Sequence, residues 1–532
     1  ASDVYKRQVK GESFLASRSF ERRMIMDFRS VLGTSNKRRL ALLERLYYRR
    51  DGWSSDQLLS ELNCSLPILL NDIELINDEY PDFQITKTKG LYRLNVGKRV
   101  SLGNLYANIL NTSPEFQIIE ELLYEECENI TALAKKLYLS SSNTQRYLKK
   151  LEKVLSMAGM ELCYRPLRVE GNEGEIRNFY YRFYSEKQNA FESSMPKLPT
   201  KHYHIIGEYV EEFVRVNQIH EKYVFQKRLI YNFYISIWRV KNGHDYPKEE
   251  LRTEGLFLPM DIEYKKLKQA VREGVDLELT PEMVRDGLWL IFSDSIVFSF
   301  QHRELAMTDN ANYQQLFMRH YELVEEYNEM LGFRLEKQVR INLTTVLSND
   351  FYMYDPQGQY VCLLWRNRTM FLSEASKIYS RGVEKIANLV KRFVAKYEMY
   401  QEEDFVRNYI YLLITMEERC MEWLAHQEPL LKILLLSDLT PTEESFLAKQ
   451  ISDKIYGNFI INHFENLSGG IAQLHYELKN YDCLITTGSA EGLPNDYPVV
   501  VIDPFLTSQS TRWIQEMISE LEEKRNLVTM IE

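Results

Sequence analysis

Residues 129–170 read NITALAKKLYLSSSNTQRYLKKLEKVLSMAGMELCYRPLRVE, and this stretch decides the fold of the N-terminal part of the chain. Apolar residues at helical spacing predict a short helix over Ile130–Leu137. The serines at 140–142 are favoured N-caps and predict the start of a longer helix, Asn143–Leu155. Alternating residues over Glu161–Val169 predict a β-hairpin. Two helices joined by a turn and followed by a hairpin are the parts of a winged helix-turn-helix.

The same order of elements recurs about seventy residues earlier in the chain. Helical spacing predicts helices over Lys37–Arg50 and Gln57–Leu62, and a third helix through Ile68–Ile76. Two alternating segments, 83–86 and 91–94, predict a second hairpin. Because two copies of one unit support each other, we predict two N-terminal winged helix-turn-helix domains.

The rest of the chain changes character twice. From Tyr203 to about His426 it is long, acidic and helical, with breaks near Gly255–Pro259 and Tyr352–Gln359, which predicts two all-helical bundles. From Leu431 onwards short apolar strands alternate with helices, as in a small parallel α/β domain. The predicted fold class is therefore multidomain and mainly α. The predicted boundaries are 1–25 for a leader, 26–100 and 101–190 for the winged domains, 191–308 and 309–427 for the bundles, and 428–532 for the α/β domain.

The leader is excluded from the predicted fold. The run Ser2–Gln8 resembles the translation of a transposon end used in sequencing libraries. Residues 1–25 are therefore interpreted as an artefact or as a disordered N-terminus. Met24 and Met26 are the alternative natural starts, and Met26 is the better one.

Composition favours a globular protein of a reducing compartment. Hydrophobic residues make up 45% of the chain and charged residues 27%, which is ordinary for globular domains. The six cysteines are scattered without metal-ligand spacing, so neither structural disulfides nor a metal site is expected. No apolar run is long enough to span a bilayer. We therefore expect a cytoplasmic protein without membrane contact. The cysteines are Cys64, Cys127, Cys163, Cys362, Cys420 and Cys483.

The charge distribution favours the second winged domain as a nucleic-acid contact. The formal net charge of the chain is −10, so any contact with DNA needs a locally basic face. Residues 131–170 hold eight basic and three acidic side chains. Cationic side chains there can displace counterions from phosphates. The alternative is that Lys149, Lys150 and Lys153 form a solvated helix face.

The start of the second long helix has side chains able to read base edges. Serine, asparagine, threonine, glutamine and arginine supply the donors and acceptors that match the major groove. The basic residues of the helix and the hairpin would contact phosphates. The predicted DNA contacts of this domain are Ser141, Ser142, Asn143, Thr144, Gln145, Arg146, Lys149, Lys150, Arg165 and Arg168.

The first winged domain is nearly charge-balanced, so it is predicted to be a weaker or supporting contact. Its third helix offers Ser65 and Asn71, but it also carries Asp72 and Glu74, which phosphates would repel. Its hairpin adds Lys87 and Lys89. A purely structural role for this domain is the alternative.

Beyond the hairpin, the phrase Leu167–Tyr180 (LRVEGNEGEIRNFY) resembles the exit that links winged helices to regulatory bundles in sugar-controlled regulators. Together with the domain order, the chain resembles the Mga/AtxA family of regulators over about residues 26–530. The resemblance rests on domain order and diffuse patterns. It implies that the bundles are regulation domains phosphorylated on histidine by the sugar phosphotransferase system, and that the tail is similar to an enzyme IIB domain.

Two positions depart from the patterns that the resemblance implies. A histidine usually stands seven residues before the arginine that here is Arg239, but this chain has Asn232, whose amide cannot accept a phosphoryl group. An active enzyme IIB domain has a cysteine after its first strand, where this chain has Ser437–Thr440. Phosphorylation would therefore use other imidazoles. The candidates are His204, His220, His302 and His320.

The predicted function is a DNA-binding transcription regulator that activates transcription and binds promoter DNA as a homodimer. Its activity would respond to phosphocarrier proteins of the sugar phosphotransferase system. The chain shows no Walker loop, GxGxxG, HExxH or GxSxG motif, so we predict neither an enzyme nor a cofactor. The alternatives are a dimeric DNA-binding scaffold that senses nothing and an RNA-binding antiterminator.

Overall fold

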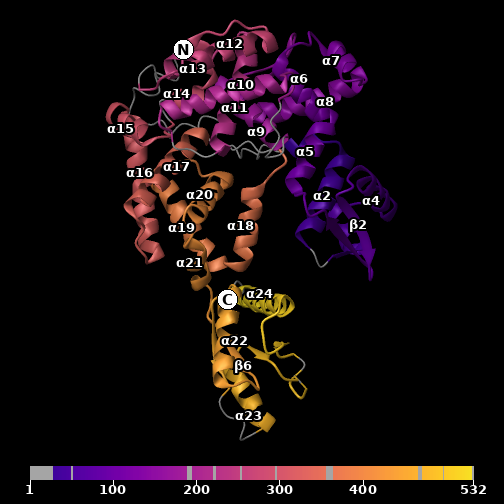
Figure 1. Cartoon of the computed structure of the whole chain (residues 1–532). Coiled ribbons are helices and arrows are strands. Elements are labelled where there is room, and N and C mark those ends of the chain that lie inside the picture. Colours follow the sequence, from indigo (N-terminus) through magenta and orange to yellow (C-terminus); the bar gives the residue numbers. More distant parts are fainter. Residues whose placement is uncertain are drawn as a thin grey trace. The chain divides into compact units, whose positions relative to one another are not determined.

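The computed structural model describes residues 28–49, 52–187, 195–219, 223–251, 255–293, 296–354, 363–464, 470–489, 491–494 and 496–529. These residues are mainly helical and contain three small sheets, as Figure 1 shows. They form two compact units. The first contains the described residues up to Phe317 and those of Ser348–Arg366. The second contains Met318–Leu347 and the described residues from Asn367 onwards. The leader, Met24, Met26 and the turn at 355–358 lie outside the described residues.

The first part of the chain folds as predicted into three helices and a hairpin. Ser54 caps the second helix, because its Oγ accepts from the Gln57 N–H at 3.3 Å and its own N–H donates to the Gln57 side chain at 3.0 Å. The hairpin turns at Lys89 and Gly90, which both have positive φ angles. The elements are α2 (Thr34–Tyr48), β1 (Trp53–Ser54), α3 (Ser55–Leu62), α4 (Leu66–Glu79), β2 (Phe83–Thr88) and β3 (Leu91–Val96).

The next part repeats this order with an added helix at its start, α5, which the sequence patterns did not predict. Asn129 and Ser140 cap the two helices that were predicted from the opening stretch, each by accepting a backbone N–H three residues on. The elements are α5 (Leu102–Thr112), α6 (Pro114–Tyr124), α7 (Ile130–Lys136), α8 (Ser141–Met157), β4 (Glu161–Tyr164) and β5 (Leu167–Glu170).

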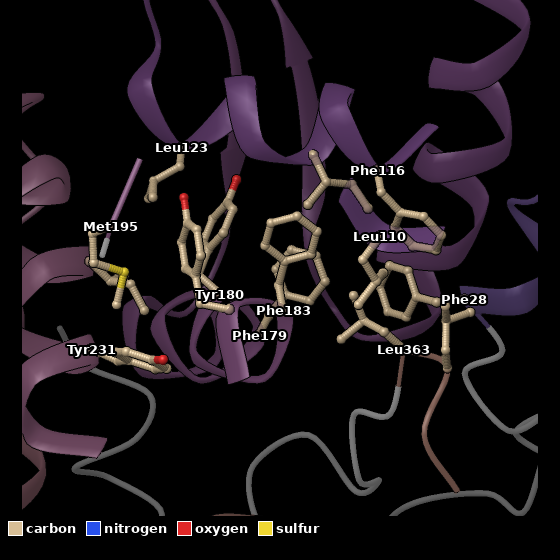
Figure 2. Packing of buried hydrophobic residues seen from close by; sticks show 14 of the residues in the cluster. Phe28, Leu110, Phe116, Leu123, Phe179, Tyr180, Phe183, Met195, Tyr231 and Leu363 are labelled. Carbon is tan, nitrogen blue, oxygen red and sulfur yellow. The ribbon is translucent and has the colours of Figure 1, made fainter. Parts of the chain in front are cut away.

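The helix that follows, α9 (Glu173–Lys187), forms the centre of the first unit's core. It packs against both α5 and α11 (Tyr223–Lys241). Figure 2 shows its rings between Tyr231 and Met195 on one side and Phe28 and Leu363 on the other. Since one buried cluster joins these side chains, the helix-turn-helix segments and the following helices share a core.

In the remaining part of the first unit, α12, α13 and α14 pack around α10 and α11. Many large aromatic side chains are buried there, including Tyr209 and Phe233. The helices are α10 (Thr200–Val216), α12 (Ile262–Val275), α13 (Pro281–Gly287), α14 (Trp289–Phe292) and α15 (Phe300–Asp309), followed by the first turns of α16 (Ala311–Leu331) and the last of α17 (Lys337–Tyr354).

The second unit begins with a helical part. Its helices are the rest of α16 and α17, and α18 (Asn367–Ile378), α19 (Ser380–Lys396), α20 (Glu403–Thr415) and α21 (Cys420–Gln427). His320 on α16 and Tyr409 on α20 meet in its interior, with 2.8 Å between Nε2 and the hydroxyl. Phe393 on α19 packs against both rings. A polar pair therefore sits inside an aromatic cluster.

The C-terminal part is a parallel α/β arrangement, as predicted. The strands lie in the order β7-β6-β8-β9, and all three pairings are parallel. Ile433 packs with α22 and α24 on one face of the sheet, whereas Leu434 packs with α23 on the other. The elements are β6 (Leu431–Leu436), α22 (Pro441–Lys454), β7 (Phe459–His463), α23 (Gly470–Glu477), β8 (Cys483–Thr486), β9 (Val499–Val501) and α24 (Ser508–Thr529).

The carboxyl of Glu522 on α24 makes the second unit sensitive to pH. Burial raises the pKa of Glu522 to about 7, and the charge of Glu428 acts in the same direction. The folded state therefore favours the protonated form, so that the stability it contributes is present below about pH 4.5 and is lost as the pH rises through about 7. We expect Glu522→Gln to raise the free energy of unfolding at pH 8 by about 1–2 kcal/mol and to have little effect at pH 4.5.

Urea unfolding of the full chain at pH 4.5, 6 and 8 measures this difference. Glu520→Gln, at an exposed position on the same helix, is the control and should change the stability little at any pH. An equal effect of Glu522→Gln at all three values would contradict the assignment.

Candidate nucleic-acid interface

One face of α8 is exposed and polar, and the opposite face is buried. Leu148, Leu151 and Leu155 lie in the core at helical spacing. The exposed face begins at the N-cap Ser140 and carries side chains for both base edges and phosphates. Its exposed residues are Ser141, Ser142, Asn143, Gln145, Arg146 and Lys149. Six of the ten predicted contacts of the second domain thus share one accessible surface.

The structure corrects the prediction for Thr144. This side chain is fully buried, and its Oγ1 donates to the Ser140 carbonyl at 3.0 Å. Position 144 lies one turn before Leu148, on the face of α8 that turns inward. Thr144 therefore supports the start of the helix and does not reach a base edge.

Lys150 is also used inside the protein. Its Nζ donates to the carbonyl oxygens of Val31 and Leu32, both at 3.3 Å. These carbonyls directly follow the short helix η1 (Phe28–Ser30). Lys150 therefore holds the start of the described chain against α8, which corrects its prediction as a phosphate contact.

The two predicted DNA contacts of the hairpin β4–β5 have different surroundings. Arg165 is exposed at the turn between the strands. Arg168 instead forms an ion pair with Glu170 on its own strand, with 2.6 Å between Nε and Oε1. The Glu170 carboxylate pairs with Arg168 and therefore cancels most of the attraction of Arg168 for a phosphate. Arg165 is left as the available cation of this hairpin.

The first helix-turn-helix segment places its predicted residues differently. Ser65 and Asn71 are exposed on α4, and Lys89 is exposed at the hairpin turn. Lys87 is exposed as well, but its Nζ donates to the Ser55 hydroxyl at 3.3 Å. The wing thus presents two cations, whereas α4 presents no basic side chain.

The expected repulsion by Asp72 is wrong. Its carboxylate is buried and accepts two hydrogen bonds from the Arg38 guanidinium, at 2.5 and 3.1 Å. This bidentate pair joins α4 to α2 and satisfies the carboxylate internally. Asp72 is therefore a structural residue, and Glu74 remains exposed on α4.

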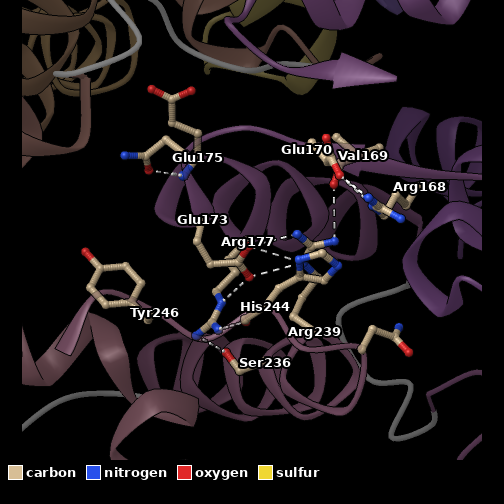
Figure 3. A network of polar contacts seen from close by, with 12 residues as sticks. Arg168, Val169, Glu170, Glu173, Glu175, Arg177, Ser236, Arg239, His244 and Tyr246 are labelled. Carbon is tan, nitrogen blue, oxygen red and sulfur yellow. Dashed lines mark hydrogen bonds and ion pairs between the residues drawn. The ribbon is translucent and has the colours of Figure 1, made fainter. Parts of the chain in front are cut away.

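A buried network of charges links the second helix-turn-helix segment to α11 (Figure 3). Arg239 on α11 donates to both carboxylate oxygens of Glu173, at 3.1 and 2.8 Å. It also reaches the Glu125 carboxylate at 3.0 Å and the Val169 carbonyl at 3.3 Å. Burial lowers the pKa of Arg239, but the hydrogen bonds and charge of Glu173 outweigh it, so that the pKa is raised. One guanidinium therefore joins the ends of α6 and β5 to the first turn of α9.

A second arginine extends the network towards α13. Arg177 is fully buried, donates to Glu173 at 2.8 Å and reaches the carboxylate of Asp286 at 2.6 Å and the hydroxyl of Ser236 at 2.9 Å. Burial raises the pKa of Asp286, and Arg177 offsets part of this effect. The exit phrase noted in the sequence thus supplies both partners, Glu173 and Arg177, although no sequence pattern pointed to Asp286.

Comparisons with known proteins agree with this geometry. Residues 98–184 match the Mga helix-turn-helix domain, and this range includes α8, the hairpin β4–β5 and most of α9. A protein of Streptococcus pneumoniae serotype 4, described as a candidate trans-acting regulator, is 21% identical over 465 residues, which covers 86% of this chain and 92% of that protein. The chain is thus similar to regulators of the Mga/AtxA type.

Two Bacillus anthracis proteins extend this similarity. The capsule synthesis positive regulator AcpA is 31% identical over 218 residues, which covers 39% of this chain and 43% of AcpA. The capsule synthesis positive regulator AcpB is 24% identical over 463 residues, which covers 80% of this chain and 92% of AcpB. Two of these three similarities extend over nearly the whole relative.

The four predicted histidines differ in accessibility. His204 is exposed on α10, whereas His302 and His320 are buried. His220 lies outside the described residues. Asn232, at the position where the family pattern has a histidine, is 1% exposed on α11. Among the described candidates, His204 is thus the imidazole that a second protein could approach.

No helix among the described residues is long and apolar enough to cross a membrane.

Proposed function

We propose that this chain is a promoter-binding positive regulator of transcription that reads DNA chiefly through α8. The observation that carries the proposal is the exposed polar and basic face of α8 within the segment that matches the Mga helix-turn-helix domain. AcpA and AcpB are both named as positive regulators, which supports activation of transcription over repression. Ser141, Ser142, Asn143, Gln145 and Arg146 read bases in this proposal, and the rest of the face contacts phosphates.

Both N-terminal segments act as winged helix-turn-helix domains in this proposal. The second adds Lys149 and Arg165 as phosphate contacts, and the first adds Lys87 and Lys89 of its hairpin. Ser65 and Asn71 are left out, because Glu74 shares their exposed helix and would meet the same phosphates.

The α8 contact is tested by Arg146→Ala combined with Lys149→Ala. Each lost base or phosphate contact costs about 1–3 kcal/mol, so we expect duplex affinity to fall about tenfold or more, with a shallower salt dependence. Fluorescence anisotropy with promoter DNA at several salt concentrations measures both.

The control removes the same charge elsewhere, by Lys265→Ala with Arg272→Ala on the exposed side of α12. This pair should leave the affinity within about twofold of the original. Unchanged affinity of the α8 variant, with its circular dichroism intact, would remove α8 from the interface.

Regulation through the sugar phosphotransferase system is the finer part of the proposal. A phosphoryl group on His204 would add nearly two negative charges beside Glu208 and Glu211 on α10, and like charges at helical spacing would loosen the local packing. The α/β tail, in which Ser437 follows the first strand, is proposed to be an enzyme IIB-like domain without phosphotransfer.

We also propose that the chain works as a homodimer through its second unit, where large apolar side chains are exposed. Phe446, Tyr456 and Phe505 are each more than 60% exposed. Light scattering of the full chain at micromolar concentration tests this assembly. The alternative function, a scaffold that binds DNA and senses nothing, is favoured by the buried amide at Asn232.

A further inference from the structure

The exposed face of α4 has a chemistry unlike that of α8. Leu66, Ile68, Leu70 and Leu75 are 37–48% exposed, although α4 occupies the place in the first segment that α8 occupies in the second. No lysine or arginine occurs between Leu66 and Glu79. An exposed helix with several half-exposed aliphatic side chains is typical of a protein contact.

The arrangement on the helix gives the chemistry of the surface. At 3.6 residues per turn, Leu66 and Leu70 lie along one edge of the exposed face, and Ile68 and Leu75 lie along the other. Glu74 and the nearby Asp78 lie between these edges. Two aliphatic ridges therefore border an acidic strip, and we call these six residues the α4 surface.

The acidic strip is not neutralised from within. Asp72 is paired with Arg38, and Glu79 is paired with Arg39 at 3.1 Å, so both arginines of α2 that reach α4 are already engaged. Glu74 and Asp78 have no ion-pair partner among the described residues and are exposed. The α4 surface thus repels phosphates and attracts a basic partner.

We propose that the α4 surface binds a protein surface on RNA polymerase in which basic side chains are bordered by apolar ones. Charge complementarity to Glu74 and Asp78 and the burial of the four aliphatic side chains supply the affinity. The choice of partner rests on the proposed function, since a positive regulator at a promoter acts on the polymerase. Bases are then read by α8 of the second helix-turn-helix segment, while α4 of the first serves as the protein contact and the hairpin of the first keeps its phosphate contacts.

Charge reversal distinguishes this proposal from a DNA contact. Added lysines should weaken a contact with a basic protein surface but strengthen a contact with DNA. Glu74→Lys with Asp78→Lys should weaken binding to purified RNA polymerase holoenzyme from the same organism at least tenfold, measured by biolayer interferometry without DNA. Promoter affinity should stay within about twofold in the anisotropy assay. If α4 instead faced DNA, the added lysines would strengthen binding and steepen its salt dependence.

Two further variants complete the test. Leu66→Ser with Leu70→Ser changes exposed side chains only, and it should also weaken polymerase binding while thermal unfolding stays unchanged. The control, Glu384→Lys with Glu418→Lys, makes the same charge change at exposed positions of the second unit and should bind polymerase normally.

The outcomes decide between the possibilities. Absence of polymerase binding by the original chain, equal losses in the control, or a shift of the α4 variants from dimer to monomer would each overturn the proposal. Failure of the original chain to bind promoter DNA would instead overturn the proposed function, because the polymerase assay contains no DNA.

Discussion

Replacing Arg239 with leucine is expected to destabilise the first compact unit by about 3–5 kcal/mol, the usual cost of removing one partner from a buried ion pair. After this change Glu173 keeps only Arg177 as a charged partner among the described residues. Glu125 loses Arg239, which is the more deeply buried of its basic partners. Both carboxylates remain buried. An uncompensated negative charge in the interior is costly because the surrounding dielectric is low.

Urea or thermal unfolding of the full chain measures this loss. Arg215→Leu is the matched control, since Arg215 pairs with Glu212 at the surface of α10 and its side chain is 71% exposed. An exposed pair contributes about 0–1 kcal/mol, so the control should unfold close to the original chain. If the two variants lost similar stability, the network would be a set of ordinary contacts and not a structural centre.

The Arg239 network also connects α11 to the hairpin β4–β5. Its contacts reach the carbonyl of Val169 in β5 and the carboxylate of Glu125 after α6. α6 packs against α8, and β5 pairs with β4, which also packs against α8. A change in α11 can therefore be transmitted to the hairpin β4–β5 through one side chain. This is a physical connection between two elements, and the unfolding experiment measures how strongly it is held.

The parts of the fold that depend on neighbouring residues could be predicted from the sequence. Serine at an N-cap, apolar residues at helical spacing and Lys89-Gly90 between alternating segments each act within a few residues. The predicted α8 and both hairpins therefore match the structure, and so do the parallel strands of the tail. α5 was not predicted, although its sequence is amphipathic and Ser101 begins it with a capping box.

The candidate site could be predicted only where a side chain's role is local. Lys150 was assigned to DNA because it is basic and follows Lys149, but it bonds to carbonyls 118 and 119 positions earlier in the chain. Asp72 was expected to repel phosphates, but its partner Arg38 lies 34 positions away. Partners at such distances are set by tertiary packing, on which periodicity and spacing carry no information.

The histidines show the same limit, because the sequence does not distinguish exposed from buried candidates. Alanine at either His204 or His320 would be harmless if both were surface phosphosites. His320, however, is fully buried, and its ring packs against Phe393 and Tyr409. Phosphocarrier proteins cannot reach an imidazole in that position without local unfolding.

We therefore expect His320→Ala to destabilise the second unit by about 2–4 kcal/mol, because it opens a cavity and removes a hydrogen-bond partner of the Tyr409 hydroxyl. His204→Ala should change the stability by less than about 0.5 kcal/mol, as is usual for an exposed residue. Thermal unfolding of both variants at one pH measures the difference.

Phosphorylation should favour His204 over His320, whereas the loss of stability on substitution is larger at His320. Incubation with phosphoenolpyruvate and the purified general phosphotransferase proteins should label His204 and should leave His320 unlabelled, as mapped by mass spectrometry. His204→Ala should then lose the label while keeping its stability, which a packing residue could not do. Label on His320 in the folded chain would mean that the second unit opens far enough to expose α16, and absence of label on every histidine would favour the scaffold that senses nothing.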